Sequence, residues 1–463
     1  SMRRTFAIAA AKTAAVLSRG LRLGGGTALP GLLSQSIDPD IVREMAGRLG
    51  HGSVLVTGTN GKTTTARLLA SILRSAGLLP VANRAGSNMM RGVAAALTEA
   101  CRLSGGFADE GRCIGVFEVD EATLPLVAAA VQPRAIVFTN LFRDQLDRYG
   151  EVEHVANLWF GAVKGLPPAT SLVLNADDPS VASLGCVATG YVVHYGLDDV
   201  AQAVEGVEHA ADARWCSNCG EELTYEAVFY GHVGHWRCLG CGWMRPSLDA
   251  VGRRVMVSDE GLEMDMVVRG AELRVRIPLW GLYNAYNALA AAAGAMALEI
   301  GPQEIGAGLA AATAAFGRQE KLEIDGKEVR VVLAKNPAGL NQVLRAITAA
   351  EGALDVALFL NDGIADGRDI SWIWDVDFEV LAGRVRELTI SGTRAWEMAL
   401  RLKYAGLDPW GRVEVDAGRA LERAIARTRR GSTIYVVPTY TAMLKVRGLL
   451  ARWAGRGGFW EDV

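Results

Sequence analysis

The sequence lacks the features of a membrane-spanning, disulfide-stapled or polyanion-binding protein. No stretch approaches the ~20 consecutive apolar residues that a membrane span needs, because charged residues interrupt the most apolar part, residues 3–23. A formal net charge of −3 gives no general reason to expect nucleic-acid binding. The seven cysteines are an odd number, and four form two C-x-x-C pairs, which suits a reducing compartment better than a disulfide framework. We therefore expect a cytoplasmic protein, with residues 3–23 forming an amphipathic surface helix rather than a signal peptide.

What is present is an ordinary globular composition spread over a long chain. Half of the 463 residues are hydrophobic and 21% are charged, as in well-packed globular proteins. A chain of this length exceeds what one hydrophobic core usually organises. We expect two or three domains.

Residues 54–65 read V-L-V-T-G-T-N-G-K-T-T-T, an apolar strand, a glycine-bearing turn and the start of a helix expected over 63–76. Such a turn points backbone N–H groups at an anion, Lys62 can reach the outer phosphates, and the Thr63 hydroxyl suits Mg²⁺. Val56 stands where the eight-residue phosphate-loop pattern has glycine, so this is the shorter G-T-N-G-K-T variant. The alternative is an ordinary strand–helix turn. We predict a nucleoside-triphosphate site formed by Gly58, Thr59, Asn60, Gly61, Lys62, Thr63 and Thr64.

Strands and helices alternate after this loop, which predicts a parallel sheet covered by helices on both faces. Strands are expected at 114–118, 135–139 and 171–174, with helices at 90–103 and 124–131. Ligands in such sheets sit at the carboxyl ends of strands, where polar clusters occur at 118–121 and 140–147. We take Glu118 as the Mg²⁺ ligand. The alternative is that Glu118, Asp120 and Glu121 cap the following helix.

Two cysteine pairs predict a structural zinc ribbon. The pairs are separated by 18 residues and each is followed by glycine, the spacing of a four-thiolate tetrahedral site. Four sulfurs complete the coordination shell, so we expect His232 and His235, which lie between the pairs, at the surface. Such a closed site stabilises a fold and has no open position for catalysis. The predicted zinc ligands are Cys216, Cys219, Cys238 and Cys241.

A second alternating series begins near residue 316 and predicts a doubly wound domain. Strands are expected at 329–334, 356–360, 388–391, 412–415 and 433–437, and the last helix at 442–453. The most polar loop, 361–369, follows the second of these strands. Just before this series, Asn284 and Asn287 lie three apart and share one face of a helix. There they either read a base edge or act as capping groups.

These motifs resemble the Mur ligase family, and within it the branch of MurT subunits. The general pattern is present in G-T-N-G-K-T at 58–63, N-A-D-D at 175–178, the helix with Asn284 and Asn287, and G-R-Q-E at 317–320. The cysteine ribbon, F-R-D-Q-L-D-R-Y-G at 142–150, K-N-P at 335–337 and D-G-R-D-I-S-W-I-W-D at 366–375 are similar to the MurT branch. The resemblance covers nearly the whole chain and implies loss of the N-terminal UDP-binding domain of other members.

The resemblance implies an α/β fold with two domains. Residues 1–316 would form a phosphate-loop ATPase domain of the Mur ligase type, with the ribbon inserted at about 212–246. Residues 317–463 would form a C-terminal Rossmann-like domain. Carried over residue by residue, Lys62 and Thr63 hold phosphates and Mg²⁺, Asn284 and Asn287 face the base, and Arg318 approaches ribose or phosphate.

The resemblance also implies an ATP-dependent amidation of the D-glutamate α-carboxylate in the lipid II stem peptide to D-isoglutamine, through an acyl phosphate. Ammonia would come from a GatD-like glutaminase subunit, whose catalytic Cys and His are completed by an acid of this chain. We take Asp369 as that acid and Asp366 as the reserve; both could instead cap the helix near Ser371. Membrane contact would be peripheral, through the lipid-linked substrate or its muropeptide.

The chain departs from the family at two positions. Many members carry Asp-His where this chain has Asp144-Gln145, and Lys164 is only a poor counterpart of the carbamylated lysine that some members use. Two other functions compete with amidation: an amino-acid-adding ligase of the folylpolyglutamate kind, and a nucleotide-switched ribbon that binds nucleic acid.

Overall fold

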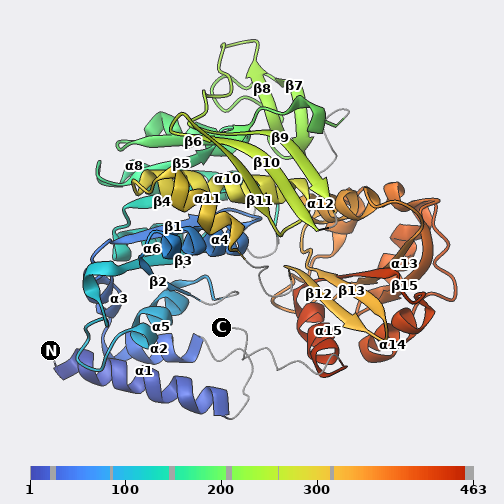
Figure 1. Cartoon of the computed structure of the whole chain (residues 1–463), viewed down its shortest axis with the longest axis horizontal. Coiled ribbons are helices and arrows are strands. Elements are labelled where there is room, and N and C mark those ends of the chain that lie inside the picture. The colour runs from blue at the N-terminus through green and yellow to red at the C-terminus, as the bar shows by residue number, and fades with distance from the viewer. Residues whose placement is uncertain are drawn as a thin grey trace.

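The computed structural model describes residues 2–20, 28–83, 87–144, 152–204, 211–258, 260–312 and 318–453. These residues form a nine-stranded sheet, a five-stranded sheet and a two-stranded hairpin. In Figure 1 the five-stranded sheet and its helices stand beside the nine-stranded sheet, and α12 (Pro337–Thr348) lies on the side that faces it.

The nine-stranded sheet has the order β11-β10-β9-β6-β5-β4-β1-β3-β2. Its strands from β2 to β9 run parallel, and β10 is antiparallel to both neighbours. The strand that precedes the phosphate loop lies between two other strands and is buried at every position, which explains its unbroken apolar run. The strands are β1 (Ser53–Thr57), β2 (Leu79–Ala82), β3 (Cys113–Glu118), β4 (Ala135–Phe138), β5 (Ser171–Asn175), β6 (Val192–Leu197), β9 (Ala250–Ser258), β10 (Gly261–Val268) and β11 (Ala271–Ile277).

Helices cover both faces of this sheet, as the sequence predicts. On β1, Val54 and Val56 belong to one hydrophobic core and Leu55 to the other, because successive side chains of a strand point to opposite faces. The first core is closed by α4 (Lys62–Ser75), α10 (Leu282–Ala297) and α11 (Pro302–Ala310). The second core is closed by α1 (Met2–Gly20), α3 (Ile41–Ala46), α5 (Met90–Ala100), α6 (Leu124–Val131) and α8 (Val152–Lys164).

The N-terminal helix α1 forms where an amphipathic surface helix was predicted. Ala7 and Ile8 are buried, whereas Phe6 and Val16 are largely exposed. It packs on α2 (Ala28–Ile37) and α5. Among the described helices, none combines the length and hydropathy needed to cross a bilayer. The remaining short elements are η1 (Glu110–Arg112), α9 (Pro179–Ala182), η2 (Ser183–Val187) and η3 (Val200–Gln202).

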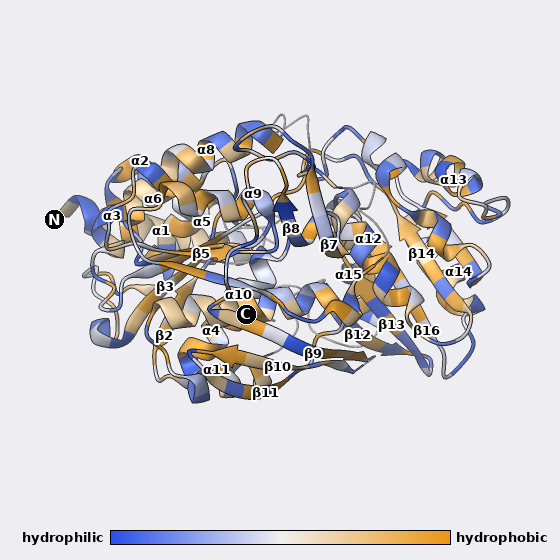
Figure 2. Ribbon diagram, turned by 90° about the horizontal axis from the view of Figure 1, so that it is seen from above, coloured by the Kyte–Doolittle hydropathy of each residue, from blue (hydrophilic) through white to orange (hydrophobic). Residues whose placement is uncertain are grey.

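The five-stranded sheet has the order β12-β13-β16-β14-β15 and is parallel except for β12. One face carries α12 and α13, and the other carries α14 and α15. Figure 2 shows β14, like β5 of the larger sheet, coloured hydrophobic along much of its length. The elements are β12 (Arg318–Ile324), β13 (Lys327–Val332), β14 (Leu354–Phe359), η4 (Ser371–Asp375), η5 (Phe378–Leu381), β15 (Val385–Ser391), α13 (Ala395–Tyr404), α14 (Ala417–Arg427), β16 (Thr433–Pro438) and α15 (Tyr440–Trp453).

The sequence prediction for this second region was wrong at two places. The strand expected at 412–415 is a single bridge between Val413 and Ile390. The strand β12 was not predicted, because its residues R-Q-E-K-L-E-I carry little apolar alternation. The proposed domain boundary at 316/317 falls outside the described residues and stays a prediction.

The hairpin of β7 (Leu223–Tyr230) and β8 (Val233–Cys238) forms the two-stranded sheet. It begins and ends beside the four cysteines of the C-x-x-C pairs. Its turn, residues 229–233, is buried in the core that contains α10. The hairpin therefore connects the cysteine cluster to the interior of the larger region.

Candidate functional site

The loop after β1 has a backbone that requires its two glycines. Gly58 has φ +134° and Gly61 has φ +85°, and α4 begins at the next residue. A Cβ on Gly58 would lie 2.0 Å from Thr139 Oγ1, and one on Gly61 would lie 2.1 Å from Asn287 Oδ1. The loop is thus packed tightly against β4 and α10, with its helix N-terminus directed at the space above it, as an anion cradle needs.

Lys62 is buried and its ammonium group is held inside this loop. It donates to the carbonyl oxygens of Gly58 and Thr59 and, at 2.8 Å, to Glu121 Oε1. Burial raises the pKa of Glu121, and the charge of Lys62 opposes that rise. No pattern in the sequence indicates this partner, since Glu121 is one of several carboxylates that follow β3.

Thr63 and Glu118 meet as a magnesium site would require. The Thr63 hydroxyl donates to Glu118 Oε2 at 2.7 Å, and Glu118 ends β3, the parallel neighbour of β1. The expected alternative, that Glu118 caps a helix, is not what its carboxylate does. Asp120 closes the following turn instead, accepting a hydrogen bond from the backbone of Ala122 at 3.2 Å. A hydroxyl and a carboxylate oxygen side by side are hard-cation ligands.

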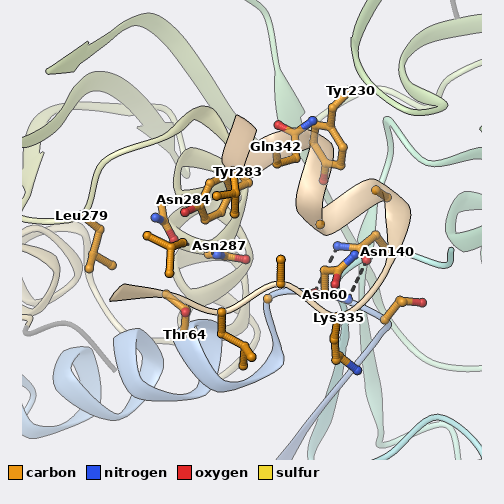
Figure 3. Close-up of a pocket in the computed structure, with 18 residues that line it drawn as sticks. Asn60, Thr64, Asn140, Tyr230, Leu279, Tyr283, Asn284, Asn287, Lys335 and Gln342 are labelled. Atoms are coloured by element: carbon orange, nitrogen blue, oxygen red, sulfur yellow. Dashed lines mark hydrogen bonds between the residues drawn. The ribbon is translucent and has the colours of Figure 1, made fainter. Parts of the chain in front are cut away.

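A cleft of about 870 Å³, open mouth included, lies over the loop. Thr59–Gly61 and Thr64 form one side, α10 a second, and the end of β13 with the start of α12 the third. In Figure 3, Asn60 and Lys335 lie at one end of the cleft and Tyr230 and Gln342 at the other, with Asn284 along the side. The chain's two large regions therefore enclose the cleft together.

Asn284 and Asn287 share the face of α10 that lines this cleft, as predicted. Their amides are tied locally, since Asn287 Nδ2 donates to Asn284 Oδ1 at 2.9 Å and Asn284 Nδ2 donates to the carbonyl of Trp280 at 2.8 Å. Asn287 Oδ1 also lies against Gly61. The pair positions the loop relative to α10 and presents its remaining polar edge to the cleft.

The second region contacts the loop through polar side chains. Asn336 caps α12 and its Nδ2 donates to Asn60 Oδ1 at 2.9 Å, while Lys335 forms an ion pair with the buried carboxylate of Asp144. Arg318 is the first residue of β12; its side chain lies outside the described residues, as does Gln145.

A smaller hollow beside the ion pairs is lined by Thr59, Glu121, Leu141, Phe142, Arg143, Asp144, Val152 and Val155.

The four predicted cysteine ligands converge, and all four sulfur atoms lie within 4.8 Å of one another. The Sγ atoms of Cys216 and Cys241 are 3.7 Å apart, and those of Cys219 and Cys238 are 3.4 Å apart. A tetrahedral ion with metal–sulfur bonds of about 2.3 Å needs sulfur separations of about 3.8 Å, so the residues present fit such an ion.

The two histidines between the cysteine pairs are not both at the surface. His232 is fully buried at the hairpin turn, with its ring 4.3 Å from that of Phe142. The expectation for His232 was wrong because its turn packs into the core instead of projecting from it. His235 is partly buried and contacts the carbonyl of Leu197 at 2.7 Å.

The two aspartates of the 361–369 loop occupy different environments. Asp366 is buried and accepts hydrogen bonds from the backbone of Thr441 at 2.8 Å and of Gly363 at 3.1 Å. Burial raises the pKa of Asp366, and the bonds from Thr441 oppose the rise. Asp369 is exposed and accepts only a local bond, from the backbone of Ser371 at 2.8 Å, among the contacts of the described residues. Asp366 therefore braces the loop, and Asp369 faces outward.

Sequence comparisons match both regions. Residues 56–234 match the family model of the Mur ligase middle domain, and residues 333–443 match that of the MurT ligase C-terminal domain. The subunit MurT of the glutamine-hydrolyzing lipid II isoglutaminyl synthase of Staphylococcus aureus strain COL is 35% identical over 447 residues, 96% of each chain. The protein of the same name from Streptococcus pneumoniae strain R6 is 35% identical over 434 residues, 93% of each chain.

Solved structures share the fold. A pseudomurein peptide ligase type C from Methanothermus fervidus superposes with a TM-score of 0.65 at 24% identity, over 85% of this chain and 77% of that one. MurF from Acinetobacter baumannii gives a TM-score of 0.63 at 18% identity, over 89% and 80% of the two chains. With a phosphate-type loop, the inserted cysteine ribbon and these relatives, the chain belongs to the Mur ligase family, in its MurT branch.

Proposed function

We propose that the chain is the ATP-dependent ligase subunit of a lipid II isoglutaminyl synthase. It amidates the D-glutamate α-carboxylate of the lipid II stem peptide, giving D-isoglutamine. The observation that supports this most directly is the loop that borders the cleft, where Thr63 meets Glu118 and Lys62 meets Glu121, in a chain that resembles MurT subunits over nearly its whole length.

A carboxylate is a poor electrophile, so one oxygen must first become a leaving group. The acceptor oxygen attacks the γ-phosphorus of ATP and ADP leaves; ammonia then attacks the acyl carbon and phosphate leaves. Lys62 stabilises the transferred phosphoryl group, exchanging its loop carbonyls for phosphate oxygens. Thr63 and Glu118 would hold Mg²⁺, which neutralises charge on the phosphates when bound. The smaller hollow is lined by Asp144 and by Glu121, the ion-pair partner of Lys62. We therefore choose this hollow as the place where the acceptor substrate binds.

We assign the cysteine cluster to structural zinc. A purified chain should carry about one zinc per molecule by elemental mass spectrometry, and Cys216→Ser should release it. Retention of stoichiometric zinc by a variant lacking two of the four thiols would refute this assignment.

We also propose that a GatD-like glutaminase docks beside Asp369. Helix α13 exposes Trp396, Leu400 and Tyr404, spaced four residues apart on one face and 60%, 49% and 69% exposed. Trp374 of η4 extends this patch, with its ring 5.7 Å from that of Tyr404. An exposed aromatic stripe of this kind is typical of a protein interface. Its continuity with η4, which begins two residues after Asp369, favours a partner that needs an outward-facing carboxylate.

The test compares nitrogen donors with one acceptor muropeptide. The chain alone should form amide with ammonium salts, and glutamine should serve only after a glutaminase is added. ATP hydrolysis should depend on the acceptor. Full-rate ATP hydrolysis without acceptor would refute the ligase proposal, and efficient use of free amino acids would favour a folylpolyglutamate-type ligase instead.

A further inference from the structure

The N-terminal helix α1 turns an apolar face to the solvent. Its large exposed side chains are Met2, Phe6, Val16 and Leu17, each more than half exposed. At about 100° of rotation per residue, these four side chains and the exposed Thr13 fall within about 100° of arc. That arc lies opposite the side of the helix that packs in the second core and contains no charged residue. The helix is therefore apolar on both sides, and only one side is covered by the protein.

Positive charge borders the exposed face. Arg3 and Lys12 lie about 40° outside its two edges, one on each side. Both donate hydrogen bonds to backbone carbonyl oxygens, and a neutral acceptor does not cancel their charge. Arg4, on the packed side, is instead paired with Glu44. Residues 2–23 contain five basic residues and no acidic one, whereas the whole chain has a net charge of −3. The positive charge of this segment thus opposes the overall sign of the protein.

Helix α1 and the smaller hollow lie on the same side of the nine-stranded sheet. Ala7 and Ile8 of α1 pack in the second core, and Val155 of α8 belongs to that core and also lines the hollow. Figure 1 shows α1 along the lower margin of the larger region, outside α5. A surface that binds α1 is therefore on the side of the sheet from which α8 reaches the hollow.

We propose that the exposed face of α1 binds the surface of an anionic lipid bilayer. An apolar stripe flanked by Arg and Lys is typical of helices that lie in the membrane interface, with the stripe at the acyl boundary and the cations among the headgroups. The charge of such a bilayer is opposite to that of residues 2–23, whereas a second copy of the helix would bring like charges together. The purpose of this contact rests on the proposed function, in which the acceptor is lipid-linked; the binding itself does not.

The experiment measures binding of the full chain to large unilamellar vesicles by cosedimentation, without nucleotide or acceptor. One set of vesicles is pure phosphatidylcholine, and the other is an equal mixture of phosphatidylcholine and phosphatidylglycerol. Wild type should bind the anionic vesicles more tightly, and less so at high salt. The double variant Phe6→Ser/Leu17→Ser should weaken this binding at least about 10-fold, because it removes apolar area from the interface. Arg3→Gln/Lys12→Gln should weaken it about 10-fold on the anionic vesicles only.

Trp215→Ser is the matched control, because Trp215 is 63% exposed near the cysteine cluster, at the end of the larger region opposite α1 (Figure 1). It should bind like wild type, and the melting temperature of every variant is recorded to confirm folding. Equal binding of wild type to both kinds of vesicle would overturn the proposal, as would wild-type binding by Phe6→Ser/Leu17→Ser. A wild-type dimer in analytical ultracentrifugation that this double variant abolishes would assign the face to a second copy instead.

Amidation of a soluble muropeptide with ammonium separates this inference from the proposed function. All the α1 variants should keep the wild-type rate, because their substitutions lie outside the nucleotide and acceptor sites. If wild type binds anionic vesicles as expected but forms no amide, the proposed function fails and the lipid-binding face stands. If wild type forms amide but does not bind the vesicles, the inference is wrong and the proposed function stands.

Discussion

The two sheets of this protein place polar loops at equivalent positions, yet the loops have opposite characters. At the end of β1 and β3, Lys62, Glu118 and Glu121 are each about 5% exposed and bonded to one another or to the loop. At the end of β14, Asp369 is exposed and Ile364 is 83% exposed, and Asp362 of the same loop pairs with Arg394, the residue before α13. One strand end is closed around its own side chains, and the other is open.

The difference indicates what each strand end can bind. A buried, mutually paired cluster pre-organises charge for a small polyanion, because the protein has already replaced water around it. An exposed carboxylate has no such enclosure and needs a second macromolecular surface to exclude water. The comparison therefore predicts that substitutions at the closed end affect all amide formation, whereas substitutions at the open end affect only the glutamine-dependent route.

The largest effect is expected for Lys62→Ala. Amide formation should fall at least about 10³-fold with either ammonium or glutamine, because the transferred phosphoryl group loses its buried cation. Product is measured by mass spectrometry of the muropeptide. Lys164→Ala, on the exposed end of α8, is the control and should keep wild-type rates. A Lys62 variant as active as wild type would remove the closed end from catalysis.

Asp369→Asn should separate the two nitrogen sources. The glutamine-dependent rate should fall about 10²- to 10⁴-fold, as when the acid of a catalytic triad loses its charge, while the ammonium-dependent rate stays unchanged. Rates are measured in the reconstituted complex with each donor. Asp366→Asn should instead lower the melting temperature, because an amide nitrogen replaces Oδ2, which accepts hydrogen bonds from the backbone of Gly363 and from the Thr441 hydroxyl. An equal fall of the glutamine-dependent and the ammonium-dependent rate in Asp369→Asn would contradict the assignment of the open strand end to the glutamine-dependent route.

Partner affinity should respond to the α13 face. Trp396→Ala and Tyr404→Ala should each weaken glutaminase binding about 30-fold, the effect of a central aromatic anchor. Biolayer interferometry with immobilised partner measures it. Trp215→Ala is the matched control, since Trp215 is 63% exposed near the cysteine cluster. Wild-type affinity in both α13 variants would place the partner elsewhere.

The smallest effect is a pH dependence of stability at the open end. Hydrogen bonds from Thr393 and Arg394 hold the pKa of Asp362 below its usual range. Its stabilisation is therefore present above the unfolded-state pKa of about 3.9 and is lost as the pH falls through the lower folded-state value. Because the pair is partly exposed, we expect at most about 1 kcal/mol. Urea unfolding between pH 5 and pH 2 should show a steeper loss for wild type than for Asp362→Asn.

Much of this arrangement was accessible from the sequence, because strands buried on both faces read as apolar runs and the loop after β1 has a fixed spacing. Glu118 and the four cysteines could be chosen as candidate metal ligands for the same reason: their placement follows from position along the chain. The ion pair of Lys62 with Glu121 and the proximity of Tyr230 to Gln342 could not be predicted from the sequence. These depend on how the hairpin and the second region fold back, and no local pattern encodes that. His232 illustrates the limit, since a turn residue between predicted metal ligands gave no sign of its burial.

Asp177 lies where the hairpin module and α10 join. Its fully buried carboxylate accepts hydrogen bonds from Arg245, four residues beyond the last cysteine, at 2.5 Å and from the Tyr286 hydroxyl at 2.7 Å. Burial raises the pKa of Asp177, and Arg245 opposes the rise. Excising the cysteine module would strand this anion without its counter-charge, at a cost of several kcal/mol. A minimised version of the enzyme would therefore need a neutral residue at position 177 before the module could be shed.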